Sequence, residues 1–319
     1  MKIAITGANG HLGLRLIGEL CQEHEVLALV RSDSAAQAIQ NQYPGAVSCA
    51  VVDYTNARSL AGAVKGAETL VHLVGIIKES RDNSFYEAHQ ATSLALVGMF
   101  DQPTDSGQDI THTQEYSEPF ALQHIIYLSL LGVDKHSNNQ CFASRAEAED
   151  VLKGAPVPVS ILRVPMVLGE GDFASGSLAK KAKKKVCFIL RGESLEQPIY
   201  AGDVIKAITS RLLKRNEPVE SLTIELAGPE SLTRKQLTLR ASSCFGGDPA
   251  VISVPQILII LVAWCLERFA ENPPVTRAML GVLDHDDNID VKPALAQLKI
   301  SLTSLDETLS KVLRGRDPG

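Results

Sequence analysis

The chain has 319 residues, 45% of them hydrophobic and 21% charged, a composition typical of a soluble globular protein with one large domain or a domain and a smaller lobe. Its formal net charge of −6 argues against general nucleic-acid binding, which needs a dense basic surface. The six cysteines include no C-x-x-C pair, which indicates free thiols of a reducing compartment and suggests neither a disulfide framework nor a zinc site.

The first thirteen residues, MKIAITGANGHLG, predict a strand, a glycine turn and the start of a helix. Lys2–Thr6 is a short apolar run, and Gly7, Gly10 and Gly13 follow it at intervals of three. In a dinucleotide-binding unit these glycines permit a tight turn, the approach of a pyrophosphate and close packing of the helix. An amphipathic segment and a second strand at Glu25–Val30 supply the context that the motif requires. The expected dinucleotide contacts here are Thr6, Gly7, Asn9, Gly10, His11, Leu12 and Gly13.

Alternating strands and helices through the first half predict an α/β fold, a doubly wound parallel (Rossmann) sheet that is covered on both faces. Ligands of such a sheet bind beyond the carboxyl ends of its strands, so functional residues are expected just after each strand. The expected strands are Lys2–Thr6, Glu25–Val30, Ala46–Asp53, Thr69–Val74, His124–Ser129 and Val159–Val164. The expected helices are Leu12–Glu23, Ser34–Asn41, Asn56–Val64, Ser84–Phe100 and Ala143–Lys153.

The residues after the second strand bear on the choice of cofactor. Arg31 stands where an NAD-selective protein usually has an acidic residue for the ribose 2′-hydroxyl. A guanidinium at this place can hold a 2′-phosphate through charge-assisted hydrogen bonds. The sequence therefore favours NADP(H) over NAD(H), although the acidic Asp33 lies only two positions further on.

Later strand ends supply the other expected cofactor contacts. After the third strand, Asp53 and Tyr54 are placed to contact the adenine, and Asp53 is equally a candidate cap for the helix that starts near Asn56. Glycine at the end of the fourth strand would let the backbone lie against the cofactor. The expected contacts at the ends of the fourth and sixth strands are Leu73, Val74, Gly75 and Pro165.

A polar insertion at 101–120 interrupts the pattern and predicts either a flap over the site or a surface insertion. His112 and His124 have no partners at metal-ligand spacing, so no metal site is predicted. We expect residues 1–170 to form the NAD(P)-binding domain. Residues 171–319 should partly return to the sheet and partly form a substrate or partner lobe.

The second half carries weaker signals. Lys180–Lys185 predicts a solvated helix face, or a contact to anionic lipid headgroups or an acidic partner. Asp203 is the expected N-cap of a helix at Val204–Lys214, and Thr223–Ala227 should return one more strand. From about Ser231 we expect a helix-rich lobe that closes over the nicotinamide end. Its expected parts include a helix at Ile257–Leu266, too short to span a bilayer and either buried or interfacial, and a solvated acidic loop at Asp284–Asp287.

With these residues in view, the chain resembles the extended and atypical short-chain dehydrogenase/reductases, NmrA-like proteins that bind NAD(P)H. More narrowly, it is similar to the branch that contains the accessory subunit of respiratory complex I with this fold. The resemblance covers nearly the whole length, and the tail with Thr276 also fits. Its motifs are TGANGHLG (Thr6–Gly13), LVR (Leu29–Arg31), HLVGIIKE (His72–Glu79), YLSLLG (Tyr127–Gly132), SRAEAEDVL (Ser144–Leu152), ILRVPMVLG (Ile161–Gly169), YAGDV (Tyr200–Val204) and ELAGPESLT (Glu225–Thr233).

The family's reductases use a Ser, a Tyr and a Lys, and the resemblance aligns these positions with Ser129, Cys141 and Arg145. The four-residue spacing of Tyr and Lys would put an ammonium beside a phenol for proton transfer. Here a thiol beside an arginine would tend to be a thiolate, which is no acid, or else an inert, half-buried thiol. Arg145 can still hydrogen-bond the ribose hydroxyls, so binding can survive without the standard chemistry.

Candidates for a substitute proton donor lie near the fourth strand. Lys78 and Glu79 lie just beyond it, where a substitute acid would act, and His89 either faces the nicotinamide or packs inside its helix. We therefore weigh an NADP(H)-binding protein in which the cofactor has a structural, sensing or assembly role against an NADPH-dependent reductase of a small apolar carbonyl, enone or quinone-like substrate. A sugar-nucleotide epimerase or dehydratase comes third, since it needs the missing tyrosine.

The expected partners are a nicotinamide dinucleotide and either a protein or a small apolar substrate, with no nucleic acid. Because the first strand begins at Lys2, we expect no signal or transit peptide and a cytoplasmic protein. Peripheral contact with a membrane, direct or through a partner, stays open.

Overall fold

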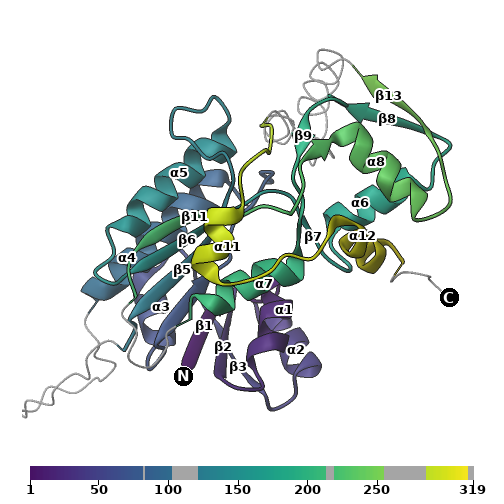
Figure 1. Cartoon of the computed structure of the whole chain (residues 1–319). Helices are drawn as coiled ribbons and strands as arrows, with labels where there is room; N and C mark the ends of the chain where they lie inside the picture. Colours follow the sequence, from purple (N-terminus) through teal and green to yellow (C-terminus); the bar gives the residue numbers. More distant parts are fainter. Residues whose placement is uncertain (82, 103–120, 213–218, 255–284, 315–319) are drawn as a thin grey trace, which may run out of the picture.

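The computed structural model describes residues 1–81, 83–102, 121–212, 219–254 and 285–314, and it is built around one parallel sheet (Figure 1). The strands of this sheet are β1 (Lys2–Thr6), β2 (Glu25–Val30), β3 (Val47–Val51), β4 (Thr69–His72), β5 (His124–Leu130), β6 (Val159–Val164) and β11 (Leu222–Glu225). They lie in the order β11-β6-β5-β4-β1-β2-β3, and all neighbours are parallel. The predicted doubly wound sheet is confirmed, and β11 is the returning strand expected near Thr223.

Helices cover both faces of the sheet (Figure 1). The helices on one face are α1 (His11–Leu20), α2 (Asp33–Gln42), α7 (Ala201–Ser210) and α11 (Lys292–Leu298). The segments on the other face are α3 (Ala57–Ala63), α4 (Thr92–Gly98), η2 (Met99–Asp101) and α5 (Gln140–Lys153), and η1 (Tyr86–Ala91) packs against α4 and α5. The helix expected over Ser84–Phe100 is therefore present, but its first part, η1, is π-helical.

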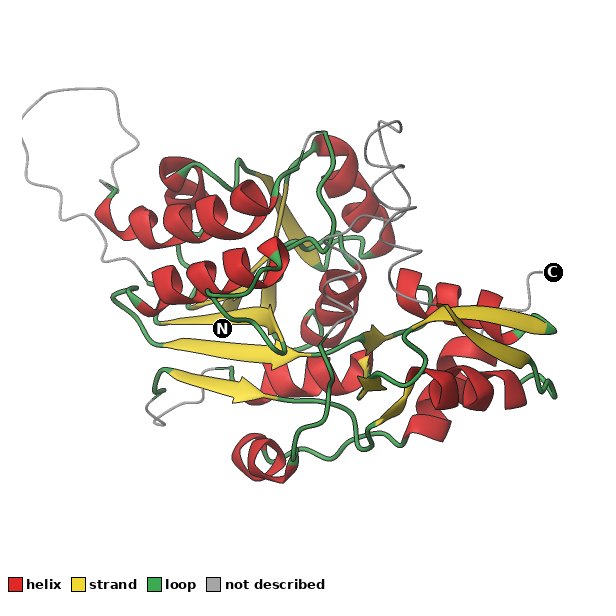
Figure 2. Ribbon diagram, turned by 90° about the horizontal axis from the view of Figure 1, so that it is seen from above, coloured by secondary structure: helices red, strands yellow, loops and turns green. Residues whose placement is uncertain are grey.

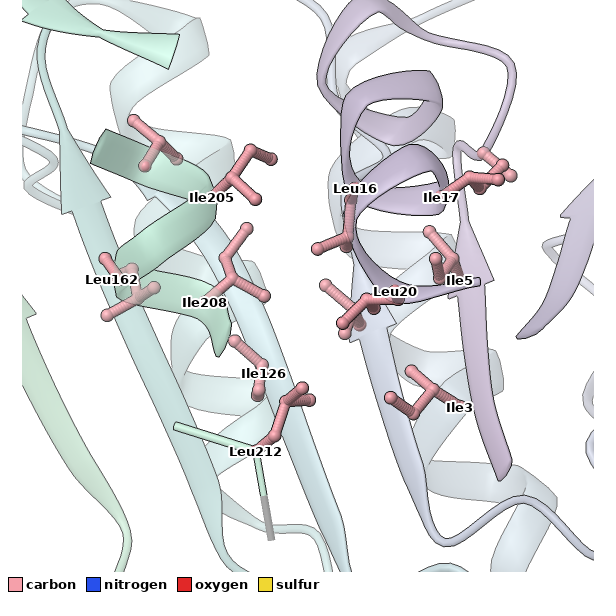
Figure 3. Packing of buried hydrophobic residues seen from close by; sticks show 14 of the residues in the cluster. Ile3, Ile5, Leu16, Ile17, Leu20, Ile126, Leu162, Ile205, Ile208 and Leu212 are labelled. Carbon is pink, nitrogen blue, oxygen red and sulfur yellow. The ribbon is translucent and has the colours of Figure 1, made fainter. Parts of the chain in front are cut away.

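The core lies between the sheet and these helices. Ile3 and Ile5 face α1, whereas Ala4 between them faces the opposite layer, so β1 is buried on both sides. This explains why the strand is a continuous apolar run rather than an alternating one. Leu16 of α1 and Ile208 of α7 pack in the same cluster, as Figure 3 shows.

A smaller lobe lies to one side of the sheet (Figures 1 and 2). It contains α6 (Phe173–Ala182), α8 (Arg234–Ser243) and α12 (Leu305–Arg314), which share one hydrophobic cluster, and the parallel pair of β8 (Val186–Leu190) and β13 (Ala250–Val254). Two short strand pairs join β7 (Val167–Leu168) to β10 (Ile199–Tyr200) and β9 (Leu195–Glu196) to β12 (Leu232–Thr233). The expectation that the lobe begins near Ser231 was wrong, because α6 and β8 already belong to it and α11 packs back against the sheet.

The capping role predicted for Asp203 was also wrong. Helix α7 begins at Ala201 with Tyr200 as its N-cap, so Asp203 lies in the first turn. Its carboxylate is buried and accepts hydrogen bonds from the backbone N–H (2.6 Å) and the hydroxyl (3.0 Å) of Thr303. Asp203 therefore ties the C-terminal segment to the sheet domain, a role that its local sequence does not reveal.

Several predicted segments lie outside the described residues: most of the insertion at 101–120, the apolar run Ile257–Leu266, Thr276, Asp284, and Lys214 at the expected end of a helix. Over the ranges that are described, no helix is both long enough and apolar enough to cross a membrane. The run Lys180–Lys185 is only partly helical, since α6 ends at Ala182 and the last three lysines lead into β8.

Candidate functional site

The glycine turn has the backbone shape that the motif predicts. Gly7 has a φ of +69°, in the left-handed region that favours glycine. A Cβ at Gly13 would lie 2.5 Å from the carbonyl oxygens of both Gly7 and Ala8. The third glycine thus lets α1 approach the turn itself, and the N-terminus of α1 is held at the carboxyl end of β1.

A cleft of about 610 Å³ lies along this edge of the sheet. It combines the glycine turn with the exposed Arg31 after β2 and with Asp53 after β3. Its expected cofactor residues are Gly7, Asn9, Gly10, Arg31, Asp53, Tyr54, Leu73, Val74 and Gly75, and its other lining residues are Val52, Thr55, Ile76, Asn83, Glu87, Ala88 and Thr92. Sequence positions that are far apart are therefore brought into one elongated site.

Tyr54 supports this cleft from below. Its hydroxyl accepts a hydrogen bond from the N–H of Gly7 (2.9 Å) and donates one to the carbonyl of Leu29 (2.5 Å). Burial raises the pKa of Tyr54 to about 12, so the phenol stays protonated. The hydroxyl is thus used to pin the glycine turn to β2, and only the ring remains for an adenine.

Asp53 does not cap α3, because Asn56 is the N-cap and accepts a hydrogen bond from the N–H of Ser59 (3.0 Å). The Asp53 carboxylate instead accepts hydrogen bonds from the N–H (2.9 Å) and hydroxyl (2.7 Å) of Thr55, which lower its pKa. It therefore shapes the turn at the rim of the cleft and keeps a negative charge there.

The three positions that the resemblance aligns with the family's Ser, Tyr and Lys lie near the ends of β4 and β5. Ser129 is buried on β5, and its hydroxyl has no hydrogen-bond partner within the described ranges. Cys141 is fully buried in the first turn of α5, and its thiol points to the carbonyl of Ile76 (3.5 Å). Burial raises the pKa of Cys141 and outweighs the lowering effect of Arg145. Of the two states expected for this thiol, burial favours the inert, neutral one over the thiolate.

Arg145 lies over the backbone at the end of β4. Its side chain is 7% exposed, and Nη1 donates a hydrogen bond to the carbonyl of Leu128 (3.1 Å). A Cβ at Gly75 would lie 2.0 Å from Nη2, so only glycine leaves room for the guanidinium. The small residue expected to admit the cofactor thus also admits Arg145, and Nε of Arg145 has no partner among the described residues.

His89 has the second of its two expected roles, that of a histidine packed inside the protein. It lies in η1 and is fully buried, with Nδ1 2.7 Å from the hydroxyl of Ser144 and Nε2 3.1 Å from the backbone of Ile76. Burial first, and then the charge of Arg145, lower the pKa of His89 to about 3. The imidazole is therefore neutral, and it fixes the loop after β4 against α5.

His72 and Tyr127 form the buried floor that sequence reasoning missed. Nδ1 of His72 is 2.7 Å from the hydroxyl of Thr6, and its ring stacks on Tyr127 with centroids 5.2 Å apart. Burial and Arg145 lower the pKa of His72 to about 3. Thr6 thus uses its hydroxyl inside the protein. The only local signal was a histidine that ends a buried strand.

The remaining expected residues lie around the site. Pro165 is buried between β6 and β7, and Lys78 and Glu79 are in the loop between β4 and η1. Glu79 accepts a hydrogen bond from the N–H of Phe85 (2.7 Å) and shapes that loop. His124 lies within hydrogen-bond distance of the hydroxyl of Ser160 (2.9 Å), whereas His112 is outside the described residues.

His11 faces a second cleft, of about 590 Å³, between α1 and the lobe. Its other walls come from α6 and α12, including Phe173, Lys180 and Leu313. Leu12, the neighbouring expected contact, packs against the core of the sheet domain. The helix start thus has the first cleft on the side of Gly10 and the lobe cleft on the side of His11.

The described part of the acidic loop, residues 285–287, is less solvated than expected. Burial, and then the charge of Glu196, raise the pKa of Asp287 to about 7. The carbonyl of Asp287 accepts a hydrogen bond from the hydroxyl of Ser231 (2.7 Å). His285 packs edge-on against Phe142 of α5, with ring centroids 6.0 Å apart. This segment therefore bridges the lobe and α5, and the described residues contain no cluster of potential metal ligands.

Comparisons with known proteins agree with this geometry. A family model described as NAD(P)H-binding matches residues 7–186. The chain is 27% identical over 240 residues to the mitochondrial NADH dehydrogenase (ubiquinone) 1 alpha subcomplex subunit 9 of Arabidopsis thaliana, covering 73% of this chain but only 55% of that subunit. It is 25% identical over 257 residues to a ceramide reductase of Caulobacter vibrioides, covering 79% and 73% of the two chains.

A solved structure shares the architecture of the whole chain. The triphenylmethane reductase of Citrobacter sp., complexed with NADP(H), superposes with a TM-score of 0.70 over 98% of this chain and 100% of that one. At 20% identity this likeness shows the fold alone. The match extends through the lobe, so sheet and lobe together form the shared fold.

Proposed function

Because the chain belongs to the NAD(P)H-binding family, we propose that it holds NADP(H) along the carboxyl edge of its sheet, mainly for a structural, sensing or assembly role. The cleft fits such a ligand, because Gly7 in its wall has the required positive φ. Ser129 and Arg145 do not line the cleft itself, but each has a buried polar atom without a partner among the described residues, and Arg145 packs against Gly75, which does line it. Arg31 would hold the 2′-phosphate and the N-terminus of α1 the pyrophosphate. When bound, the nicotinamide supplies hydride chemistry.

The burial of Cys141 is the observation that favours a non-catalytic role. The resemblance places it where the family's reductases have the acidic tyrosine, but its thiol is fully buried against the carbonyl of Ile76 and its pKa is raised. A group that cannot reach a substrate is not a general acid. Arg145, at the lysine position, can still contribute to binding. A bound ligand stabilises a fold by mass action alone, so the cofactor can be kept without catalysis.

Identification of the nucleotide tests this proposal. We expect NADP(H) to be released from the purified protein and identified by mass spectrometry. We further expect the NADPH-loaded protein to stay reduced against a panel of quinones and enones, followed at the absorbance band of the reduced nicotinamide. If one acceptor oxidises it, and Cys141→Ala abolishes that activity while NADPH affinity holds, the non-catalytic role is wrong.

The cofactor preference has its own test at Arg31. We expect Arg31→Ala to weaken NADP(H) binding by about one to two orders of magnitude, the value of a charge-assisted pair, and to leave NAD(H) binding almost unchanged. Isothermal titration of all four nucleotides measures this. Arg240→Ala, an arginine of α8 on the lobe, is the matched control and should change neither affinity. Equal losses for NADP(H) and NAD(H) would remove the 2′-phosphate argument.

The lobe cleft favours a second candidate function, an NADPH-dependent reductase of a small apolar carbonyl, enone or quinone-like substrate. Phe173 is 77% exposed at this cleft, next to Val312 and Leu313 of α12. The similar Caulobacter protein is named as a reductase of ceramide, itself an apolar molecule. A proton would then have to come from Ser129, water or the Lys78 region.

The similarity to a subunit of NADH dehydrogenase supports a protein partner for the non-catalytic role. We infer that this protein is cytoplasmic and that such a partner can bring it to a membrane. Co-purification of the tagged chain from its own cells, with and without added NADPH, tests the dependence of this assembly on the cofactor.

A further inference from the structure

Arg145 is a buried cation that has no counter-charge beside it. Arginine stays charged in proteins, and this side chain is 7% exposed. In the described part of the chain, Nη1 donates a hydrogen bond to the carbonyl of Leu128, no carboxylate lies within ion-pair distance of the guanidinium, and Nε is unpartnered. Such a charge is costly unless a ligand or a neighbour compensates it.

The groups packed around Arg145 do not neutralise it. His72 and His89 have pKa values of about 3 and are neutral, and burial keeps the Cys141 thiol neutral as well. The buried carboxylate one turn along the same helix, that of Glu149, is engaged by the guanidinium of Arg163 (2.6 Å). Glu87, which lines the cleft, is exposed to water and accepts hydrogen bonds from Ser84. Glu79, whose charge acts on the Cys141 thiol, is exposed to water and accepts a hydrogen bond from the N–H of Phe85. The charge of Arg145 is therefore not balanced by an ion pair among the described residues.

The position of this charge relative to the cleft is set by the sheet. Arg31 and Asp53 mark the adenine end, after β2 and β3. Gly75, which Arg145 contacts, lines the opposite end of the cleft, after β4, and Arg145 also donates to the carbonyl of Leu128 on the neighbouring strand β5. A dinucleotide crosses the carboxyl edge of such a sheet from one half to the other, so its nicotinamide half belongs with Arg145.

We propose that Arg145 makes this site selective for the reduced cofactor, NADPH, over NADP⁺. This rests on the proposed function. The oxidised nicotinamide ring carries a positive charge and the reduced ring is neutral, so the buried guanidinium repels only the oxidised form. Two unit positive charges roughly 8–12 Å apart at an effective dielectric constant of about 20 repel by an amount that corresponds to roughly tenfold to thirtyfold in affinity. The protein would thereby be loaded according to the ratio of reduced to oxidised cofactor.

Hydrogen bonding by Arg145 does not predict this selectivity. Contacts from the guanidinium to ribose hydroxyls would strengthen NADP⁺ and NADPH alike, because the ribose does not change on reduction. Only the ratio of the two affinities reports on the charge. The ratio is also independent of whether the protein catalyses a reaction.

The first test uses the unaltered chain and three ligands: NADPH, NADP⁺ and adenosine 2′,5′-bisphosphate, which lacks the nicotinamide half. We expect calorimetry to show at least about tenfold tighter binding of NADPH than of NADP⁺. NADP⁺ should bind little better than the bisphosphate, because repulsion offsets its extra contacts. Equal affinities for NADPH and NADP⁺ would overturn the inference and leave the proposed function intact, whereas binding of neither would overturn both.

Variants then assign the selectivity to the charge. Arg145→Met should bring the ratio of the two affinities close to one, and Arg145→Lys, which keeps the charge, should preserve most of it. Arg31→Ala is the matched control, since it should weaken both redox forms by the same factor. A ratio that survives in Arg145→Met would contradict the role of Arg145. If that variant does not fold, the three-ligand comparison still decides.

Discussion

Replacing Gly13 with alanine is expected to abolish measurable dinucleotide binding and to lower the free energy of unfolding by about 3 kcal/mol. The new Cβ would lie 2.5 Å from two backbone carbonyl oxygens, those of Gly7 and Ala8. Neither oxygen can rotate away as a side chain would, so α1 must move relative to the turn. Because the same turn and helix end form one wall of the cleft, stability and binding should be lost together.

Denaturant unfolding with and without NADPH measures both effects. Gly62→Ala is the matched control, because Gly62 lies in α3 and a Cβ there meets nothing within 4 Å. This control should leave binding unchanged and be neutral or stabilise the protein by up to about 1 kcal/mol. Native-like NADPH affinity in Gly13→Ala would show that the turn does not hold the cofactor.

Removal of the Arg163 guanidinium by Arg163→Met should lower the free energy of unfolding by about 3–5 kcal/mol. The Glu149 side chain on α5 is 1% exposed, and Arg163 on β6 donates to it through both Nε (3.0 Å) and Nη2 (2.6 Å). Without the guanidinium a buried carboxylate is left without its charged partner. The effect is on the fold, because this pair joins α5 to the sheet beneath the site.

The comparison variant is Arg240→Met in the lobe. Arg240 also contacts two carboxylates, those of Glu230 and Asp306, but the Asp306 side chain is 71% exposed. Exposed ion pairs contribute little, so a loss of about 1 kcal/mol or less is expected. Equal losses in the two variants, measured by urea unfolding, would mean that burial of Glu149 does not govern the result.

Two residues of α5 bear on the choice between a non-catalytic binding role and a reductase. Cys141 and Arg145 lie one turn apart, yet burial affects them in opposite ways. The thiol becomes neutral and inaccessible, whereas the guanidinium keeps its charge and lies against Gly75. A site with a fixed cation and no reachable acid is better suited to binding a reduced nicotinamide than to protonating a substrate, in accord with our proposals.

The sequence by itself determined the parallel sheet and the glycine turn. Strand β1 matches the predicted Lys2–Thr6 residue for residue, and Asn56 stands directly before α3, at the predicted start of that helix. These features depend on periodicity, turn propensity and capping within a few residues, so local sequence is enough to specify them. The same holds for the tight turn at Gly7, whose positive φ is a property of one residue.

Only the tertiary structure decided the chemistry of the candidate site. Sequence reasoning left Cys141 as either a thiolate or an inert thiol and expected a cap at Asp203, but burial keeps the thiol neutral and Asp203 binds Thr303, a hundred residues away in the chain. Sequence also did not show that Arg145 lies over Gly75. Charge state and partner choice depend on desolvation and on neighbours from distant segments, and neither is encoded within a few residues of the group concerned.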